Sequence, residues 1–222
     1  MAFILSIETT TTNCSVSLSK KGETLVLKED NNTKFSHAES LHVFIDEVVK
    51  FSEIKLSDLD AIAVSKGPGS YTGLRIGVSA AKGLCFSLDK PLISVPTLES
   101  LSHQVSIDEG YIVPMLDARR MEIYSAIFDV NHVQIRETQA QILDGNSFSN
   151  YLNNNKVYFI GNGVEKTKTL IHHENAVFIE NKLPSANEMG NLAYQKYLNN
   201  DFENVAYFEP YYLKDFILGK LI

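Results

Sequence analysis

Hydrophobic and polar positions in the first half of the chain follow two different periods. Short apolar runs rich in β-branched residues predict strands, and apolar residues three and four positions apart predict helices. Strands are predicted at 3–8, 14–18, 24–27, 61–64 and 91–95, and helices at 36–51, 72–88 and 97–103, the last capped by Thr97. The helix at 36–51 has the clearest pattern, because Ser36 and Glu39 form a capping box ahead of one apolar face.

The same order of elements then begins again. Strands are predicted at 111–116, 122–128, 133–142, 157–160 and 177–179, with helices at 147–152, after Gly163, and from a capping box at Ser185 and Glu188 to about residue 199. This repeat predicts an α/β protein of two tandem halves, each with an antiparallel three-strand start followed by parallel strands. The polar stretch 104–110 marks the boundary, which gives domains at 1–105 and 106–222.

Composition narrows the class of protein. The chain has 222 residues and a net charge of −7, with 44% hydrophobic and 21% charged residues, as expected of a globular soluble protein. Nucleic acids are bound largely through Lys and Arg, so an acidic chain is expected to meet them only through another subunit. Cys14 and Cys85 lie in apolar segments and are interpreted as reduced thiols of a cytoplasmic protein. We expect no membrane span and no signal peptide.

A glycine-rich run at 67–77 carries the most specific local signal. It follows a predicted strand and opens a predicted helix. Backbone N–H groups and the helix dipole at such a junction can bind an anion, with Ser70 and Thr72 as candidate ligands. A helix cap with a tight turn explains the same residues, and it is the interpretation that we favour.

Four segments together resemble the TsaB family: 4–9, 67–77, 116–124 and 210–213. The resemblance covers nearly the whole chain and implies two tandem ribonuclease-H-like domains of the actin-like ATPase superfamily, with mixed sheets. It implies a non-catalytic subunit in the synthesis of tRNA N6-threonylcarbamoyladenosine, next to the anticodon. The expected partners are a TsaD-like catalytic subunit, which carries the metal and the tRNA site, and a TsaE-like ATPase.

The residues themselves give little support for catalysis. In actin-like kinases, glycines in two hairpin turns let the backbone approach the nucleotide phosphates closely. The corresponding turns at 8–13 and 117–121 have no glycine, so most of the nucleotide-binding site is expected to be lost. Asp117 and Arg119 are the remaining candidate ligands of the second turn, although Arg120 and Met121 depart from the family pattern there. Glu8 and Asp117 occupy matching places, but hydrogen bonding within each turn is favoured over acid–base chemistry.

Metal and nucleophile sites are also not expected. His37 and His42 are five positions apart and diverge by about 140° on a helix, and no nucleophile elbow is present. We therefore predict no catalytic residue, no metal and no cofactor. Three alternatives stay open: an actin-like phosphotransferase or ATPase, a metallopeptidase as the older label glycoprotease suggests, and a homodimeric regulatory module with a small ligand between its domains.

The helix at 72–88 is unusually apolar. Its apolar arc spans roughly 220°, about twice the stripe that a surface helix needs. Its three glycines each cost about 1 kcal/mol relative to alanine. Packing against its own sheet accounts for part of the arc, and the remainder predicts a partner surface shared with the helix at 36–51. The candidate contacts are His37, Leu41, Gly73, Leu74, Arg75, Gly77 and Val78. The resemblance implies a four-helix bundle with TsaD, and a homodimer when TsaD is absent.

Overall fold

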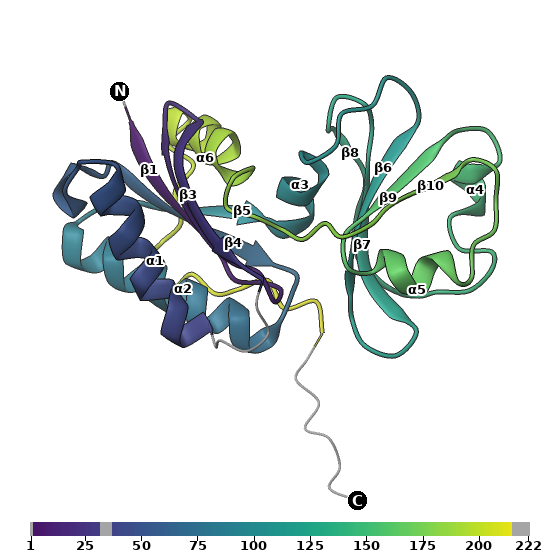
Figure 1. The fold of residues 1–222 in the computed structure, drawn as a ribbon, viewed down its shortest axis with the longest axis horizontal. Coiled ribbons are helices and arrows are strands. Elements are labelled where there is room, and N and C mark those ends of the chain that lie inside the picture. Colours follow the sequence, from purple (N-terminus) through teal and green to yellow (C-terminus); the bar gives the residue numbers. More distant parts are fainter. Residues whose placement is uncertain (1, 32–36, 215–222) are drawn as a thin grey trace, which may run out of the picture.

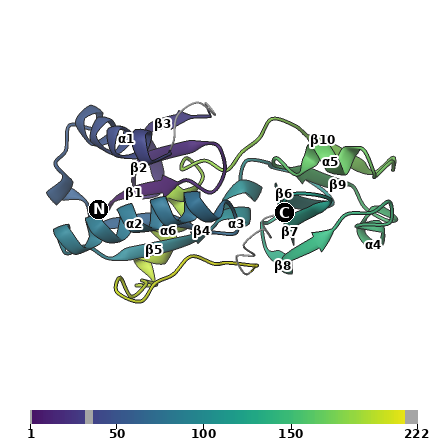
Figure 2. The ribbon, with the colours of Figure 1, turned by 90° about the horizontal axis from the view of Figure 1, so that it is seen from below.

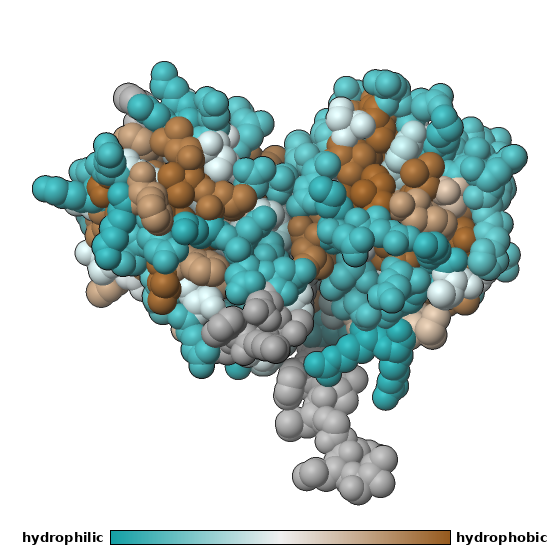
Figure 3. All heavy atoms as spheres, in the orientation of Figure 1, coloured by the Kyte–Doolittle hydropathy of each residue, from teal (hydrophilic) through white to brown (hydrophobic). Residues whose placement is uncertain are grey.

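Two five-stranded mixed sheets form the framework of the chain, which the computed structural model describes at residues 2–31 and 37–214. Each sheet and its helices form one lobe, and the lobes lie side by side (Figure 1). A notch separates them on the face drawn in Figure 3. The strand orders are β3-β2-β1-β4-β5 in the first lobe and β10-β9-β6-β7-β8 in the second.

In the first lobe, an antiparallel unit is extended by two parallel strands. The strands are β1 (Phe3–Glu8), β2 (Cys14–Lys20), β3 (Glu23–Asp30), β4 (Ala61–Gly67) and β5 (Leu92–Pro96). Helices α1 (His37–Phe51) and α2 (Tyr71–Leu88) lie next to each other on one face of this sheet, as Figures 1 and 2 show. Their buried side chains pack with Leu5 and Ile7 of β1, which the alternation of the strand directs to this face.

The second lobe repeats this plan. Its strands are β6 (Tyr111–Asp117), β7 (Glu122–Phe128), β8 (Gln134–Ile142), β9 (Val157–Ile160) and β10 (Ala176–Ile179). The short helices α4 (Ser149–Leu152) and α5 (Val164–Lys168) join the core around Phe159. Helix α3 (Thr97–Ser102) packs Leu98 and Leu101 onto the same sheet. The repeated strand order confirms the predicted α/β class with two tandem, mixed-sheet domains.

The last helix crosses back to the first lobe. Helix α6 (Met189–Leu198) packs Met189 and Ala193 against Ile4, Ala61 and Ile93 of the first sheet, and Figure 1 shows it beside β1 and β3. The connection before it is held by the β2 region, where Ser17 Oγ donates to the carbonyl of Ala186 at 2.7 Å. The sequence-based division at 105/106 grouped this helix with the second lobe, whereas its buried contacts are with the first.

Tertiary contacts also changed two predicted helix caps. Helix α6 begins at Met189, beyond Ser185, whose hydroxyl donates to Glu29 at 2.7 Å and accepts the N–H of Asn187 at 3.2 Å. Thr97 lies inside α3 instead of capping it, and its hydroxyl accepts the N–H of Gly67 at 3.1 Å. The predicted cap at Ser36 falls outside the described residues. A 3₁₀ turn, η1 (Leu56–Asp58), precedes β4. Among the described residues, no helix combines the length and apolar character needed to cross a bilayer.

Candidate functional site

The glycine-rich loop joins β4 to α2 and is closely packed on both sides. A Cβ on Gly69 would lie 2.5 Å from the Cβ of Thr10, so only glycine lets the first turn approach this closely. Ser70 donates its N–H to the carbonyl of Thr10 at 2.7 Å, and its hydroxyl accepts the N–H of Gly73 at 3.3 Å. Ser70 is therefore the N-cap of α2, in agreement with the favoured interpretation of this loop. Thr72 lies exposed in the first turn of the helix.

The first turn is closed by its own carboxylate. Glu8 is fully buried, and its Oε1 accepts hydrogen bonds from the N–H and the hydroxyl of Thr10 at 2.6 and 2.5 Å. Burial raises the pKa of the Glu8 carboxyl, and hydrogen bonds from Ser65 and Thr10 partly oppose that shift. With no surface open to solvent, this carboxylate stabilises the turn and cannot reach a substrate from the position it occupies.

The second turn is tied down in a similar way. Asp117 Oδ1 accepts the N–H of Arg119 at 2.6 Å and pairs with Lys166 Nζ at 2.7 Å. Arg119 and Arg120 both adopt left-handed backbone angles, with φ of 69° and 50°, at the exposed tip of the hairpin. The carboxylate of Asp117 is therefore occupied by its own turn and by α5, as favoured from the sequence.

The candidate anion ligands Ser70, Thr72, Asp117 and Arg119 do not line the small hollow beside the glycine-rich loop. This hollow of about 50 Å³ lies between the lobes, where Gly69 and Tyr71 face Tyr124. Within the described part of the chain, no group of three or more His, Cys, Asp or Glu side chains is placed to hold a metal ion.

Helix α2 meets the first turn through its glycines. A Cβ on Gly73 would lie 2.0 Å from the carbonyl oxygen of Thr9, and a Cβ on Gly77 would lie 2.3 Å from Thr9 Oγ1. Thr9 Oγ1 also donates to the carbonyl of Gly73 at 2.8 Å. The close approach that these two glycines permit is therefore made by the chain's own turn.

Most of the predicted partner contacts are consequently buried within the first lobe. Five of the seven are covered by the chain itself: Leu41, Gly73, Leu74, Gly77 and Val78. They cannot form an accessible surface in this structure, which corrects the sequence-based expectation. His37 and Arg75 are the other two. His37 Nε2 lies 2.6 Å from the carbonyl oxygen of Thr11, so it links the start of α1 to the first turn.

Arg75 is exposed but held in place by the C-terminal segment. Its guanidinium lies 4.2 Å from the centre of the Tyr71 ring, and its Nε donates to the hydroxyl of Tyr212 at 3.3 Å. Nearby, Lys82 Nζ donates to the carbonyls of Ala206 and Phe208. Residues 201–214 thus form a strap along one side of α2, which the sequence did not predict because the strap has no periodic pattern.

The outward side of the α1–α2 pair remains open. We call this surface the outer helix face; it consists of His42 and Val43 from α1 and of Ile76, Ser79, Ala80 and Gly83 from α2. Val43 is 52% exposed, and a Cβ on Gly83 would meet no atom within 4 Å. Small side chains at 79, 80 and 83 leave room for another helix to approach closely.

Comparisons with known proteins identify the family. The family described as TsaD: tRNA N6-adenosine threonylcarbamoyltransferase matches residues 31–218. The tRNA threonylcarbamoyladenosine biosynthesis protein TsaB of Haemophilus influenzae is 29% identical over 232 residues, covering 98% of this chain and 95% of that protein. TsaB of Buchnera aphidicola is 30% identical over 170 residues, covering 76% and 68%. The chain belongs to the TsaB family.

Two further similarities place this TsaB-family chain among related folds. The tRNA N6-adenosine threonylcarbamoyltransferase of Staphylococcus epidermidis is 33% identical over 128 residues, covering 51% of this chain and 38% of that enzyme. The solved structure of YeaZ from Pseudomonas aeruginosa has a TM-score of 0.82 at 23% identity, covering 96% of this chain and all of that one. At this level of identity, the similarity to YeaZ shows only that the two chains share a fold.

Proposed function

We propose that this TsaB-family chain acts in tRNA N6-threonylcarbamoyladenosine biosynthesis as a non-catalytic subunit that binds a TsaD-like catalytic subunit. The names of its relatives supply the pathway. The outer helix face supplies the binding surface. In this proposal the tRNA is contacted only through the assembly, which suits a chain with a net charge of −7.

Gly83 is the observation that carries the proposal. A glycine inside a helix costs about 1 kcal/mol relative to alanine, so a packing reason is expected for it. Gly73 and Gly77 have such a reason within the chain, in the approach of Thr9. Gly83 has no such reason within the described residues, because none of their atoms lies within 4 Å of the position that a Cβ would take. Close approach by a second molecule is the reason that remains.

The identity of the partner is argued from fold relatedness. The TsaD family match covers residues 31–218, which include α1 and α2, so a TsaD-like enzyme is expected to carry an equivalent helix pair. Two equivalent pairs can stack across a pseudo-two-fold axis as a four-helix bundle. The same face explains a homodimer when the partner is absent. A TsaE-like ATPase then joins the assembly in the cytoplasm.

The proposed lack of catalysis rests on the state of the two turns. Glu8 is fully buried in the first turn, and Asp117 forms an ion pair with Lys166. Both thiols are buried, and burial raises the pKa of Cys14 to about 11 and that of Cys85 to about 12, so neither is an active nucleophile near neutral pH. The contribution to the pathway is then architectural: binding fixes the conformation of the catalytic subunit.

Co-elution on a sizing column tests the proposal. Gly83→Leu adds a large side chain to the outer helix face, at a position where a Cβ has no atom of the described residues within 4 Å. We expect this variant to fold normally and to lose co-elution with the TsaD-like subunit of the same organism. Gly145→Leu, at an exposed loop of the second lobe, is the matched control and should co-elute as the unmodified chain does. Retained co-elution of Gly83→Leu at dilute concentration would reject the proposed face.

A further inference from the structure

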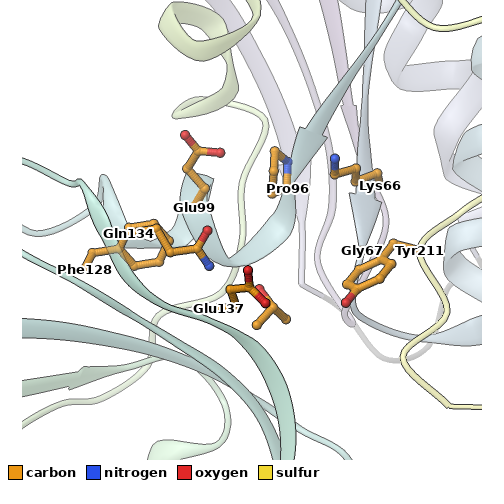
Figure 4. A pocket seen from close by; sticks show the side chains of 9 residues that line it. Lys66, Gly67, Pro96, Glu99, Phe128, Gln134, Glu137 and Tyr211 are labelled. Atoms are coloured by element: carbon orange, nitrogen blue, oxygen red, sulfur yellow. The ribbon is translucent and has the colours of Figure 1, made fainter.

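A pocket of about 260 Å³ lies between the two lobes, away from the outer helix face (Figure 4). The first lobe contributes the end of β4 and Pro96, and α3 contributes Glu99. The second lobe contributes β7 and β8, and the strap closes one side with Tyr211. A molecule bound here would contact both lobes and the strap at once.

Several charged and polar side chains line this pocket without a hydrogen bond or ion pair to any described residue. Among the described residues, the side chains of Lys66, Gln134 and Glu137 form no hydrogen bond or ion pair, and Glu99 is near Lys66 and Lys196 without a direct pair. Burial raises the pKa of the Glu99 carboxyl, and the charges of Lys196 and Lys66 oppose this shift. Two carboxylates and one ammonium leave the pocket with a net negative charge.

The charges are divided between opposite walls. Figure 4 shows Lys66 on one side, and Glu99, Gln134 and Glu137 across from it. Pro96 lies between these walls and adds apolar surface, whereas Phe128 lies beside Gln134 and is only 2% exposed. A phosphate would be repelled by the two carboxylates, and a divalent cation would be repelled by Lys66. A ligand that carries one carboxylate and two separate cationic groups complements both walls.

We propose that this pocket binds a free basic amino acid. Its carboxylate would pair with Lys66, its two cationic groups with Glu99 and Glu137, and its methylene chain would cross the pocket past Pro96. The volume suits a molecule of amino-acid size. Because the lining comes from both lobes, such a ligand stabilises one interlobe arrangement by mass action.

Calorimetric titration of the full chain with L-lysine tests this assignment. Three analogues each remove one charge: cadaverine lacks the carboxylate, L-norleucine lacks the side-chain ammonium, and Nα-acetyl-L-lysine lacks the α-ammonium. We expect saturable binding of L-lysine and at least about tenfold weaker binding of each analogue, because a charged hydrogen bond is lost each time. No saturable binding of L-lysine up to about 10 mM, or equal binding of all four molecules, would overturn the proposal.

Two variants connect the binding to this pocket. Glu137→Gln should weaken L-lysine binding about tenfold, and Lys66→Met should weaken L-lysine but leave cadaverine unchanged. Glu165→Gln removes a carboxylate from the exposed face of α5, outside the pocket, and is the matched control. If both pocket variants bind L-lysine as tightly as this control, the site is elsewhere. Gly83→Leu should bind L-lysine normally, so this result is independent of the proposed partner surface.

Discussion

At the scale of single residues, the glycines of α2 show what a sequence pattern leaves undecided. The helical pattern placed Gly73, Gly77 and Gly83 on a helix with too much apolar surface. It could not show that Thr9 covers the first two, because that contact joins residues more than sixty positions apart. The prediction of a partner surface therefore named residues on the inward side of the helix and missed Gly83.

Alanine substitution should change the free energy of unfolding in opposite directions at Gly77 and Gly83. Gly77→Ala forces a Cβ against Thr9 Oγ1 and should lower the free energy of unfolding by about 1–3 kcal/mol. Gly83→Ala meets open space and should raise it by about 0.5–1 kcal/mol, through helix propensity. Urea unfolding of both variants measures this. A destabilised Gly83→Ala would mean that the glycine has an unseen role within the chain.

A stacked histidine pair gives a pH dependence at the same scale. His103 and His132 have ring centres 4.0 Å apart. Burial, and secondarily His132, lower the pKa of His103 from 6.5 to about 4. The unfolded chain therefore binds a proton more readily than the folded chain in this range, and stability should fall as the pH drops from about 6.5 toward 4.

Thermal unfolding across this pH range tests the histidine contribution. His103→Gln should flatten the decline in Tm, because it removes the group whose protonation is disfavoured in the fold. His172→Gln, at an exposed turn, should leave the decline as it is in the unmodified chain. Equal slopes for the unmodified chain and His103→Gln would contradict the assignment.

At the scale of elements, local patterns predicted the strands and helices, whereas two helix caps were predicted wrongly. Strands β1, β7 and β9 have the predicted bounds, because short apolar runs and alternation determine them locally. The caps at Thr97 and Ser185 were predicted wrongly: Thr97 lies inside α3 with its hydroxyl bound to Gly67, and α6 begins only at Met189, beyond Ser185. The strap was missed since it is held by contacts with α2 and has no regular structure of its own.

The strap should loosen when its main hydrogen-bond donor is removed. Lys82 Nζ donates to Ala206 and Phe208 at 3.2 and 3.0 Å. Lys82→Met should speed amide exchange of residues 204–212 and cost about 1 kcal/mol of stability. Lys90→Met, just beyond the end of α2, is the matched control. Unchanged exchange in the strap would show that its other contacts hold it without Lys82, among them the hydrogen bond from the N–H of Tyr211 to the carbonyl of Lys66 at 2.7 Å.

At the scale of the whole molecule, the sequence predicted the two repeated halves but not how the chain connects them. Helix α6 was predicted from a capping box, and nothing local indicated which sheet it packs against. The position of α6 on the first sheet depends on the packing of Ala193 and Met189 against Ile4. It also depends on the segment before α6, which is hydrogen-bonded to β2. The interlobe pocket was missed for the same reason, since its residues come from four separate parts of the chain.

The central claim is that the outer helix face binds a TsaD-like subunit, and the most direct test is the affinity of that subunit for two matched variants. Val43→Asp and Ile135→Asp each place a charge at a half-exposed apolar position, on α1 and on β8 respectively. Calorimetric titration should show at least about tenfold weaker binding for Val43→Asp, because a charge would be buried unpaired at the interface. Ile135→Asp should bind as the unmodified chain does. Equal affinity of the two variants, or a loss confined to Ile135→Asp, would contradict the account.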